Sequence, residues 1–262
     1  MGISLHTLRT VMMACGLAAS AATAALAAAG PEPAGSFSPG AGPTEPFGLA
    51  TATVVAGAVN DKWQQLKRKL DDERVQLALC DGDRDNCASD AALRFLTIVD
   101  SARRREGRAR LGEINRAINL ALRPMSDLAQ YGEVDVWSSP LMTFDRGAGD
   151  CEDYAIAKFM ALSLAGIAAE DLRIIIMRDA FHGGDHAVTA VRLDGHWLML
   201  DNMRMAMVED VHVRNYLPLF AIDQSSVARY FEVPLLASTT GTPVPAAPAS
   251  LPTEPGLIAL PE

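Results

Sequence analysis

The spacing of hydrophobic residues predicts a helix in the middle of the chain. Between residues 109 and 124, Leu111, Ile114 and Ile118 recur every three or four positions, and Pro124 closes the run. This is the period of a helix with one buried face, and proline is a common stop.

A second helical stretch starts at residue 150. Cys151, Ala155 and Phe159 share one face, and Gly166 is a plausible stop. We therefore predict a buried helix whose first turn holds Cys151 on the side that faces the core.

Beyond this helix the period changes to that of strands. The segments 172–178, 186–193 and 196–200 are rich in apolar and β-branched residues. Asp194 and Gly195 separate the last two, and Asp-Gly favours a two-residue type I′ hairpin turn. Helices followed by a small antiparallel sheet indicate an α+β domain.

The hairpin predicts which side chains meet. If Asp194 and Gly195 form the turn, Leu193 pairs with His196, and His186 and Asp201 become diagonal neighbours on one face. Their separation would be roughly 7 Å, within reach of an imidazole and a carboxylate. A slip of one residue would put them on opposite faces.

The chain ends differ in composition from the middle. Residues 1–29 carry one basic residue and a long alanine-rich apolar run that ends in Ala-Ala-Ala, as in a secretory signal peptide. Residues 30–46 and 237–262 are rich in Pro, Ala, Gly, Ser and Thr, which predicts flexible segments. One domain remains, residues 47–236, and we expect it in the periplasm.

Net charge limits the partners. The whole chain has a formal charge of −9; removal of residues 1–29 takes away one of 23 basic residues and none of the 32 acidic ones, which leaves −10. This acidity argues against nucleic acid as a partner. Five arginines between residues 103 and 110 fit a solvated face, because no aromatic residues interleave them. We find no later segment long enough to span a membrane.

Three cysteines follow the predicted signal peptide. Cys80 and Cys87 bracket a short polar loop, and in an exported chain they are expected to form a disulfide. The aspartates between them have the opening rhythm of an EF-hand, but glycine is missing at its sixth position and glutamate at its twelfth. Cys151 is left as the odd cysteine.

Cys151, His186 and Asp201 are the candidate catalytic residues of a thiol hydrolase. A histidine takes the thiol proton, an aspartate fixes its tautomer, and a helix N-terminus favours the thiolate. The ordinary alternative is an inert core thiol beside a strand-end histidine and a turn aspartate. Three other histidines fit worse as the base. His182 lies in a predicted mobile loop, and His196 follows the turn on the face opposite His186 and Asp201. His212 follows the third strand, where the pattern places no carboxylate beside it.

Three segments resemble the bacterial transglutaminase-like cysteine proteinases of the LapG type: "EINRAINLALRPMSDLAQYG", "GDCEDYAIAKFMAL" and "RDAFHGGDHAVTAVRLDGHWLMLDN". The resemblance runs from about residue 47 to about residue 222. It implies a papain- and transglutaminase-like fold, with the catalytic triad on Cys151, His186 and Asp201. It also implies limited proteolysis of a large surface adhesin near its membrane-retained end, and an inner-membrane cyclic-dinucleotide receptor as inhibitor.

Three carboxylates surround the cysteine, on Asp150, Glu152 and Asp153. Negative charge beside a thiol raises its pKa and makes it less reactive, so the presence of these acids requires an explanation. One reading is helix capping by Asp150 and complementation of the helix dipole. The other is a Ca²⁺ site, because calcium prefers several carboxylate oxygens and would cancel the negative field. The resemblance favours calcium at Asp150 and Glu152.

The sequence therefore predicts a calcium-dependent cysteine endopeptidase that controls biofilm attachment by processing an adhesin. Two alternatives stay open. A thioester intermediate can react with an amine as well as with water, so the product could be an acyl transfer. The second alternative is a binding module without catalysis on the same fold.

Overall fold

The structure is a computed structural model that describes residues 45–181 and 183–231 of the 262-residue chain. The predicted signal peptide, the C-terminal tail and nearly all of the predicted segment 30–46 lie outside the described residues. The same holds for His182 and for the last residues of the predicted domain 47–236.

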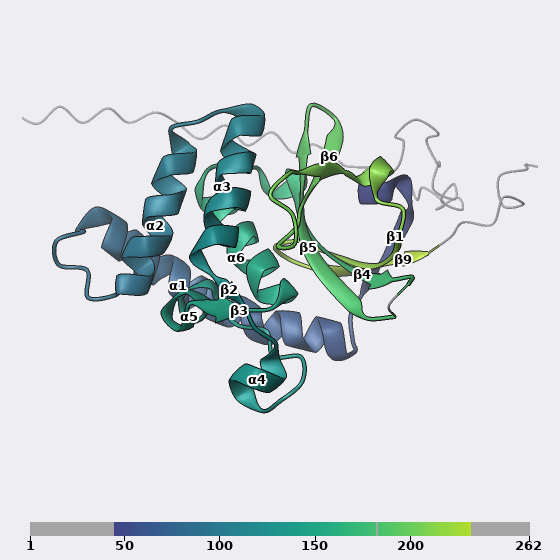
Figure 1. Ribbon diagram of the computed structural model, residues 1–262, viewed down its shortest axis with the longest axis horizontal. Helices are drawn as coiled ribbons and strands as arrows, with labels where there is room; N and C mark the ends of the chain where they lie inside the picture. Colours follow the sequence, from purple (N-terminus) through teal and green to yellow (C-terminus); the bar gives the residue numbers. More distant parts are fainter. Residues whose placement is uncertain (1–44, 182, 232–262) are drawn as a thin grey trace, which may run out of the picture. The chain divides into compact units, whose positions relative to one another are not determined.

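The N-terminal half of the described chain is helical and lies to one side of the strands (Figure 1). Its α-helices are α1 (Ala58–Gly82), α2 (Asp90–Arg103), α3 (Gly107–Ala121), α4 (Asp127–Tyr131), α5 (Pro140–Arg146) and α6 (Cys151–Leu164). Two very short strands, β2 (Arg123–Pro124) and β3 (Ala148–Gly149), pair in parallel between them. This pairing brings the segment after α3 beside the segment that enters α6.

One strand from the start of the described chain and six strands of its C-terminal half form an antiparallel sheet in the order β1-β9-β8-β4-β5-β6-β7. The strands are β1 (Ala50–Val54), β4 (Leu172–Asp179), β5 (Asp185–Leu193), β6 (His196–Leu200), β7 (Val208–Glu209), β8 (Tyr216–Ile222) and β9 (Val227–Phe231). The sheet curls strongly, so that its two edges approach each other (Figure 1). Short 3₁₀ turns precede β1 (Pro46–Gly48), precede β4 (Ala169–Asp171) and follow β7 (Asp210–His212).

The two edges of the curled sheet are joined by a hydrogen bond. The backbone N–H of Phe47, just before β1, donates to Oδ2 of Asp210, just after β7, at 2.6 Å. This contact links the segments that flank the first and last strands of the sheet order, and so it holds the two edges of the curled sheet near each other.

Two hydrophobic cores lie on the two faces of the sheet. The larger core fills the space between the sheet and the helices, and α6 runs through it with ten of its fourteen residues buried. The smaller core lines the concave face and is built around Ile175, Met177, Val188 and Met199. Alternation along β4 and β5 explains the division, because successive side chains on a strand point to opposite faces.

The predicted elements and hairpin register are observed. The helix predicted over 109–124 is α3, and the helix predicted from residue 150 is α6. Leu193 pairs with His196, and Asp194 and Gly195 have φ values of 52° and 83°, as a type I′ turn requires. The paired positions end at Thr189 and Leu200. The α+β prediction is thus confirmed.

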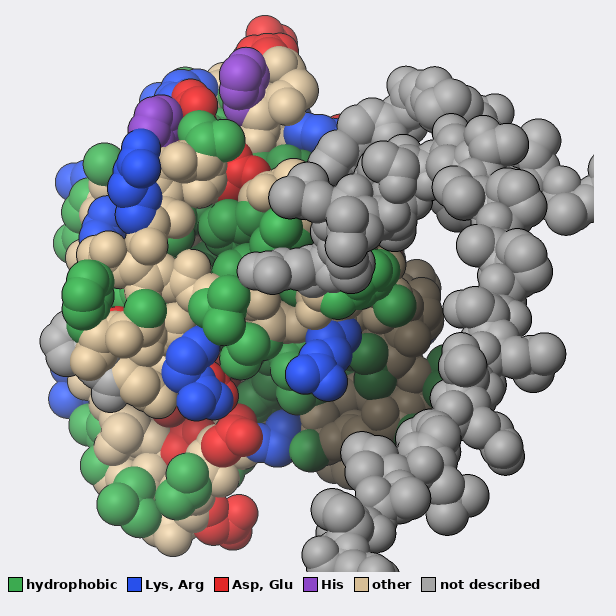
Figure 2. Space-filling model, turned by 90° about the vertical axis from the view of Figure 1, so that its right-hand side faces the viewer, with side chains coloured by type: hydrophobic (Ala, Val, Ile, Leu, Met, Phe, Trp, Pro, Cys, Tyr) green, Lys and Arg blue, Asp and Glu red, His purple; other side chains and the backbone are tan. Residues whose placement is uncertain are grey.

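The cysteine pair and the arginines also behave as predicted. Cys80 and Cys87 form a disulfide, and Cys151 is free. Among the five arginines, Arg103 lies within 3.3 Å of carboxylate oxygens of both Asp81 and Asp100, so it contributes to a network of surface ion pairs. On the face shown in Figure 2, hydrophobic, basic and acidic side chains are interspersed. Within the described ranges, no helix is long and apolar enough to cross a membrane.

Candidate active site

Cys151 is the first residue of α6 and is partly buried. Its Sγ donates a hydrogen bond to Oε2 of Glu152 at 3.1 Å. Burial raises the pKa of the Cys151 thiol above its usual range, and the charge of Glu152 raises it further. A hydrogen bond from the backbone of Ala187 acts in the opposite direction but does not outweigh them. In the arrangement observed, the thiol is therefore protonated at neutral pH.

His186 and Asp201 meet at the end of the β5–β6 hairpin. Nε2 of His186 lies 3.0 Å from Oδ1 of Asp201, and the same oxygen accepts a hydrogen bond from the backbone N–H of Met203 at 2.9 Å. Burial opposes ionisation of Asp201, but these two hydrogen bonds and the nearby charge of Lys158 together hold its pKa below the usual range. The ring of Tyr216 packs against the imidazole, with centroids 5.5 Å apart.

One cavity of about 460 Å³ is lined by both Cys151 and His186. The walls combine apolar side chains such as Trp137 with the acids that flank the cysteine. The structure thus places Cys151 and His186 on one cavity, with Asp201 hydrogen-bonded to the histidine. Because Nε2 of His186 is engaged by Asp201, Nδ1 is the nitrogen left to exchange a proton with the thiol.

The other histidines lie elsewhere in the described part of the chain. His196 is exposed at the hairpin turn, 3.7 Å from Glu209. His212 lines a second cavity, on the concave side of the sheet. Neither residue lines the cavity that holds Cys151.

A cluster of three acids adjoins the cysteine. Ligand oxygens of Asp127, Asp150 and Glu152 all lie within 4.8 Å of one another. Burial raises the pKa of Asp150 to about 8, and the charges of Glu152 and Asp127 add to the effect. The Oδ1 atoms of Asp127 and Asp150 are buried and have no hydrogen-bond partner. Orphaned carboxylate oxygens in mutual repulsion fit a hard cation such as Ca²⁺.

This cluster differs from the predicted one. Asp153 is fully buried, and its Oδ1 accepts a hydrogen bond from the backbone N–H of Ser138 at 2.9 Å instead of joining the cluster. Asp127, which the sequence analysis missed, takes its place from the start of α4. Asp150 occupies the N-cap position of α6, yet its side chain does not cap the helix; its Oδ2 accepts from the N–H of Asp127 at 3.3 Å.

Asp127 also supports one wall of the cavity. Its Oδ2 accepts a hydrogen bond from the backbone N–H of Val136, in the loop that carries Trp137 and Asp135. Lys62 on α1 forms an ion pair with Asp135 and lies 5.9 Å from the Trp137 ring. The acid cluster is therefore connected to the cavity wall opposite the strands.

Lys158 is an unpredicted polar residue beneath the site. It lies on α6, has no exposed surface, and its Nζ donates to the carbonyl of Leu200 at 3.2 Å. Burial lowers the pKa of Lys158 to about 7, although the charge of Asp201 partly opposes the shift. Asn119 on α3 donates to the carbonyl of Asp201 at 2.9 Å. Two buried or half-buried donors thus hold the backbone on which Asp201 is mounted.

Comparison with protein-family models identifies the family of this chain. The family model of the bacterial transglutaminase-like cysteine proteinases matches residues 75–228, and the chain belongs to this family. Its fold is accordingly papain- and transglutaminase-like, as predicted, and its class is that of the cysteine proteases.

Similar solved structures include Legionella pneumophila LapG, with 18% identity over 68% of this chain and 90% of that chain, at a TM-score of 0.48. A calcium-bound form of the same protein has 20% identity over 64% and 86% of the two chains, also at 0.48. An EGTA-treated form has 18% identity over 72% and 91%, again at 0.48. A comparison with curated protein sequences found no match.

Proposed function

We propose that the protein is a periplasmic, calcium-dependent cysteine endopeptidase that makes limited cuts in a large surface adhesin and thereby controls attachment in biofilms. The observation that carries the proposal is the His186–Asp201 pair beside the cavity of Cys151. Membership of a cysteine proteinase family supports the reaction class. The resemblance in sequence to the LapG type motivates the adhesin, its membrane-retained end and an inhibitory cyclic-dinucleotide receptor.

The roles of the three residues follow from their positions. Asp201 holds Nε2–H of His186, so Nδ1 accepts the proton of the Cys151 thiol as the sulfur attacks a peptide carbonyl. The imidazolium that forms is stabilised by the Asp201 carboxylate and then donates its proton to the leaving amine. The backbone N–H of Cys151, in the first turn of α6, has no carbonyl partner within the helix and is available to the oxyanion.

A calcium ion fits the acid cluster, and Asp127, Asp150 and Glu152 are the residues that would hold it. When bound, it supplies positive charge next to the thiol. The same carboxylates otherwise keep the thiol protonated, since Glu152 accepts its hydrogen bond. We therefore expect the enzyme to be inactive without the ion.

Cleavage is tested with a purified candidate adhesin, or with outer-membrane proteins of the source cell, with new termini mapped by mass spectrometry. We expect products with the wild type that are absent with Cys151→Ala and His186→Ala. Asp201→Asn should slow cleavage by orders of magnitude, whereas His196→Ala should retain it. Identical products from wild type and Cys151→Ala would refute the proposal.

The role of calcium is tested by cleavage after chelation and after Ca²⁺ or Mg²⁺ is restored. Asp127→Asn should lower the affinity of the enzyme for Ca²⁺. Asp145→Asn, at an acid on α5 outside the cluster, is the matched control. Alkylation of Cys151 by iodoacetamide gives a second readout that needs no substrate. In calcium-free buffer, Glu152→Gln should alkylate faster than wild type, because a negative neighbour has been removed. Full activity of chelated enzyme that contains no calcium would eliminate the metal from the proposal.

A further inference from the structure

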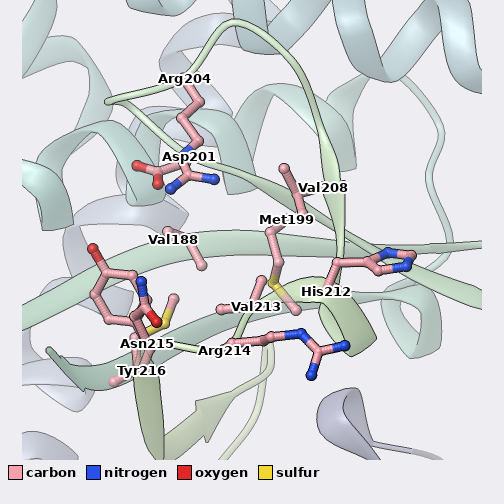
Figure 3. A pocket seen from close by; sticks show the side chains of 11 residues that line it. Val188, Met199, Asp201, Arg204, Val208, His212, Val213, Arg214, Asn215 and Tyr216 are labelled. Carbon is pink, nitrogen blue, oxygen red and sulfur yellow. The ribbon is translucent and has the colours of Figure 1, made fainter. Parts of the chain in front are cut away.

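A second cavity lies on the concave face of the sheet. It measures about 290 Å³, and its floor is formed by three almost fully buried side chains, Met177, Val188 and Met199. Two exposed arginines, Arg204 and Arg214, line its mouth (Figure 3). An apolar floor with a few charged groups at the rim is typical of a site that binds an amphipathic ligand.

The two cavities lie on either side of the catalytic pair. His186 lines the cavity of Cys151, whereas its partner Asp201 lines the second cavity. Tyr216 lines the second cavity too, and its ring packs on the imidazole of His186 at 5.5 Å between centroids. Asp201 and Tyr216, which both contact His186, therefore form part of the lining of the second cavity.

The chemistry of peptide cleavage predicts which part of the substrate lies on this side of His186. The base that takes the thiol proton later donates it to the leaving amine, so the residue after the cut must lie next to His186. The chain that follows the scissile bond then leaves the site on the side of the histidine. We propose that the second cavity is the subsite for the first few residues on the C-terminal side of the cut, an inference that rests on the proposed protease function.

The lining predicts which residues fit. The two methionines and the valine of the floor accept an apolar side chain, and methionine adapts readily to different shapes. Among the described residues, neither Arg204 nor Arg214 has a carboxylate within ion-pair distance. His212 at the rim adds no negative charge, and Asp201 is already engaged by His186. An acidic residue beside the apolar one is therefore favoured after the cut.

The cavity of Cys151 gives no comparable preference for charge. Of the four acids that line it, Asp135 is paired with Lys62, Asp185 is paired with Arg178, and Asp150 and Glu152 belong to the cluster that would hold calcium. The predicted preference for an acidic and an apolar residue therefore concerns the side after the cut.

The experiment compares two peptides that contain the mapped cleavage site and differ only in carrying Asp or Lys among the first few residues after the cut. We expect the wild type to prefer the Asp peptide in kcat/KM, and Arg204→Glu/Arg214→Glu to shift this ratio about tenfold towards Lys, the size expected for two reversed surface charges. Arg116→Glu, at an exposed arginine on α3, is the control that should keep the wild-type ratio.

A second variant addresses the apolar floor without altering charge. Val213→Phe, at a half-buried wall position, should lower kcat/KM for a peptide with Leu in this stretch more than for one with Ala. The subsite is refuted if wild type cleaves but both ratios are unchanged in the variants. If wild type shows no cleavage that depends on Cys151, the protease function itself is refuted, and the subsite with it.

Discussion

Replacement of Lys158 by methionine should make the protein more stable at neutral pH and less active. Methionine has a similar length and no charge, so it fills the same buried space on α6. Burial lowers the pKa of Lys158 from its usual 10.5 to about 7. This difference corresponds to about 5 kcal/mol of folding free energy that the charged lysine costs.

The substitution also has a cost. It removes the donor to the carbonyl of Leu200, and an unsatisfied buried carbonyl costs about 1–3 kcal/mol. The net gain in the free energy of unfolding is therefore about 2–4 kcal/mol at pH 6 to 7. Because the native state binds this proton less tightly than the unfolded chain, the penalty of Lys158 fades as pH rises from about 7 to 10.5. Near pH 10 the main remaining effect is the lost hydrogen bond to the Leu200 carbonyl, and the variant should be slightly less stable than wild type.

Urea unfolding followed by tryptophan fluorescence measures both limits, with calcium held constant. Lys67→Met, at a partly exposed lysine on α1, controls for the general effect of losing a surface charge and should stay within about 0.5 kcal/mol. Activity of Lys158→Met should fall by about 10- to 100-fold, since the backbone that carries Asp201 loses a support. Destabilisation at pH 6 to 7, or wild-type activity, would refute this reasoning.

Two further predictions concern stability. Cys80→Ser/Cys87→Ser should lower the free energy of unfolding by about 2–3 kcal/mol because an open loop has more unfolded conformations, and intact-mass counting of thiols in periplasmic material should find only Cys151 free. Gly149→Ala should cost about 1–3 kcal/mol in urea unfolding, since its Cβ would lie 2.7 Å from Cβ of Asp153; Gly82→Ala, where nothing lies within 4 Å, is the control and should not be destabilising. Two extra free thiols, or equal stability of the two alanine variants, would contradict these expectations.

The features that sequence predicted are those set by neighbouring residues. The period of α6 and the Asp194–Gly195 turn depend on contacts within a few positions, and the turn alone placed His186 near Asp201. The predicted separation of roughly 7 Å is the distance between diagonal residues, which side chains bridge by leaning toward each other, whereas the observed 3.0 Å joins Nε2 and Oδ1. The pairing of β5 with β6 ends at Thr189 and Leu200, where the chain turns. There the carboxylate of Asp201 accepts the N–H of Met203, a local turn that competes with continued pairing.

The features that sequence missed depend on distant contacts. Asp127 reaches Asp150 because β2 pairs with β3. This pairing covers only two residues, which are too few to leave a periodic pattern in the sequence. Lys158 was missed for a different reason. A lysine on a helix normally marks the solvated face, and only the packing of α6 through the larger core shows that it is buried. In both cases the exception lies at the candidate site, where local rules are expected to fail.

The pairing of β1 with β9 constrains when this protein can fold. Ala50 pairs with Phe231, 181 positions later, so the strand made first must wait for the strand made last. A chain emerging from a ribosome or a secretion channel therefore cannot complete its sheet until nearly all of the described domain has emerged. The same topology brings the two ends of the domain together, so that joining residues 45 and 231 by a short linker and opening the chain elsewhere should be tolerated.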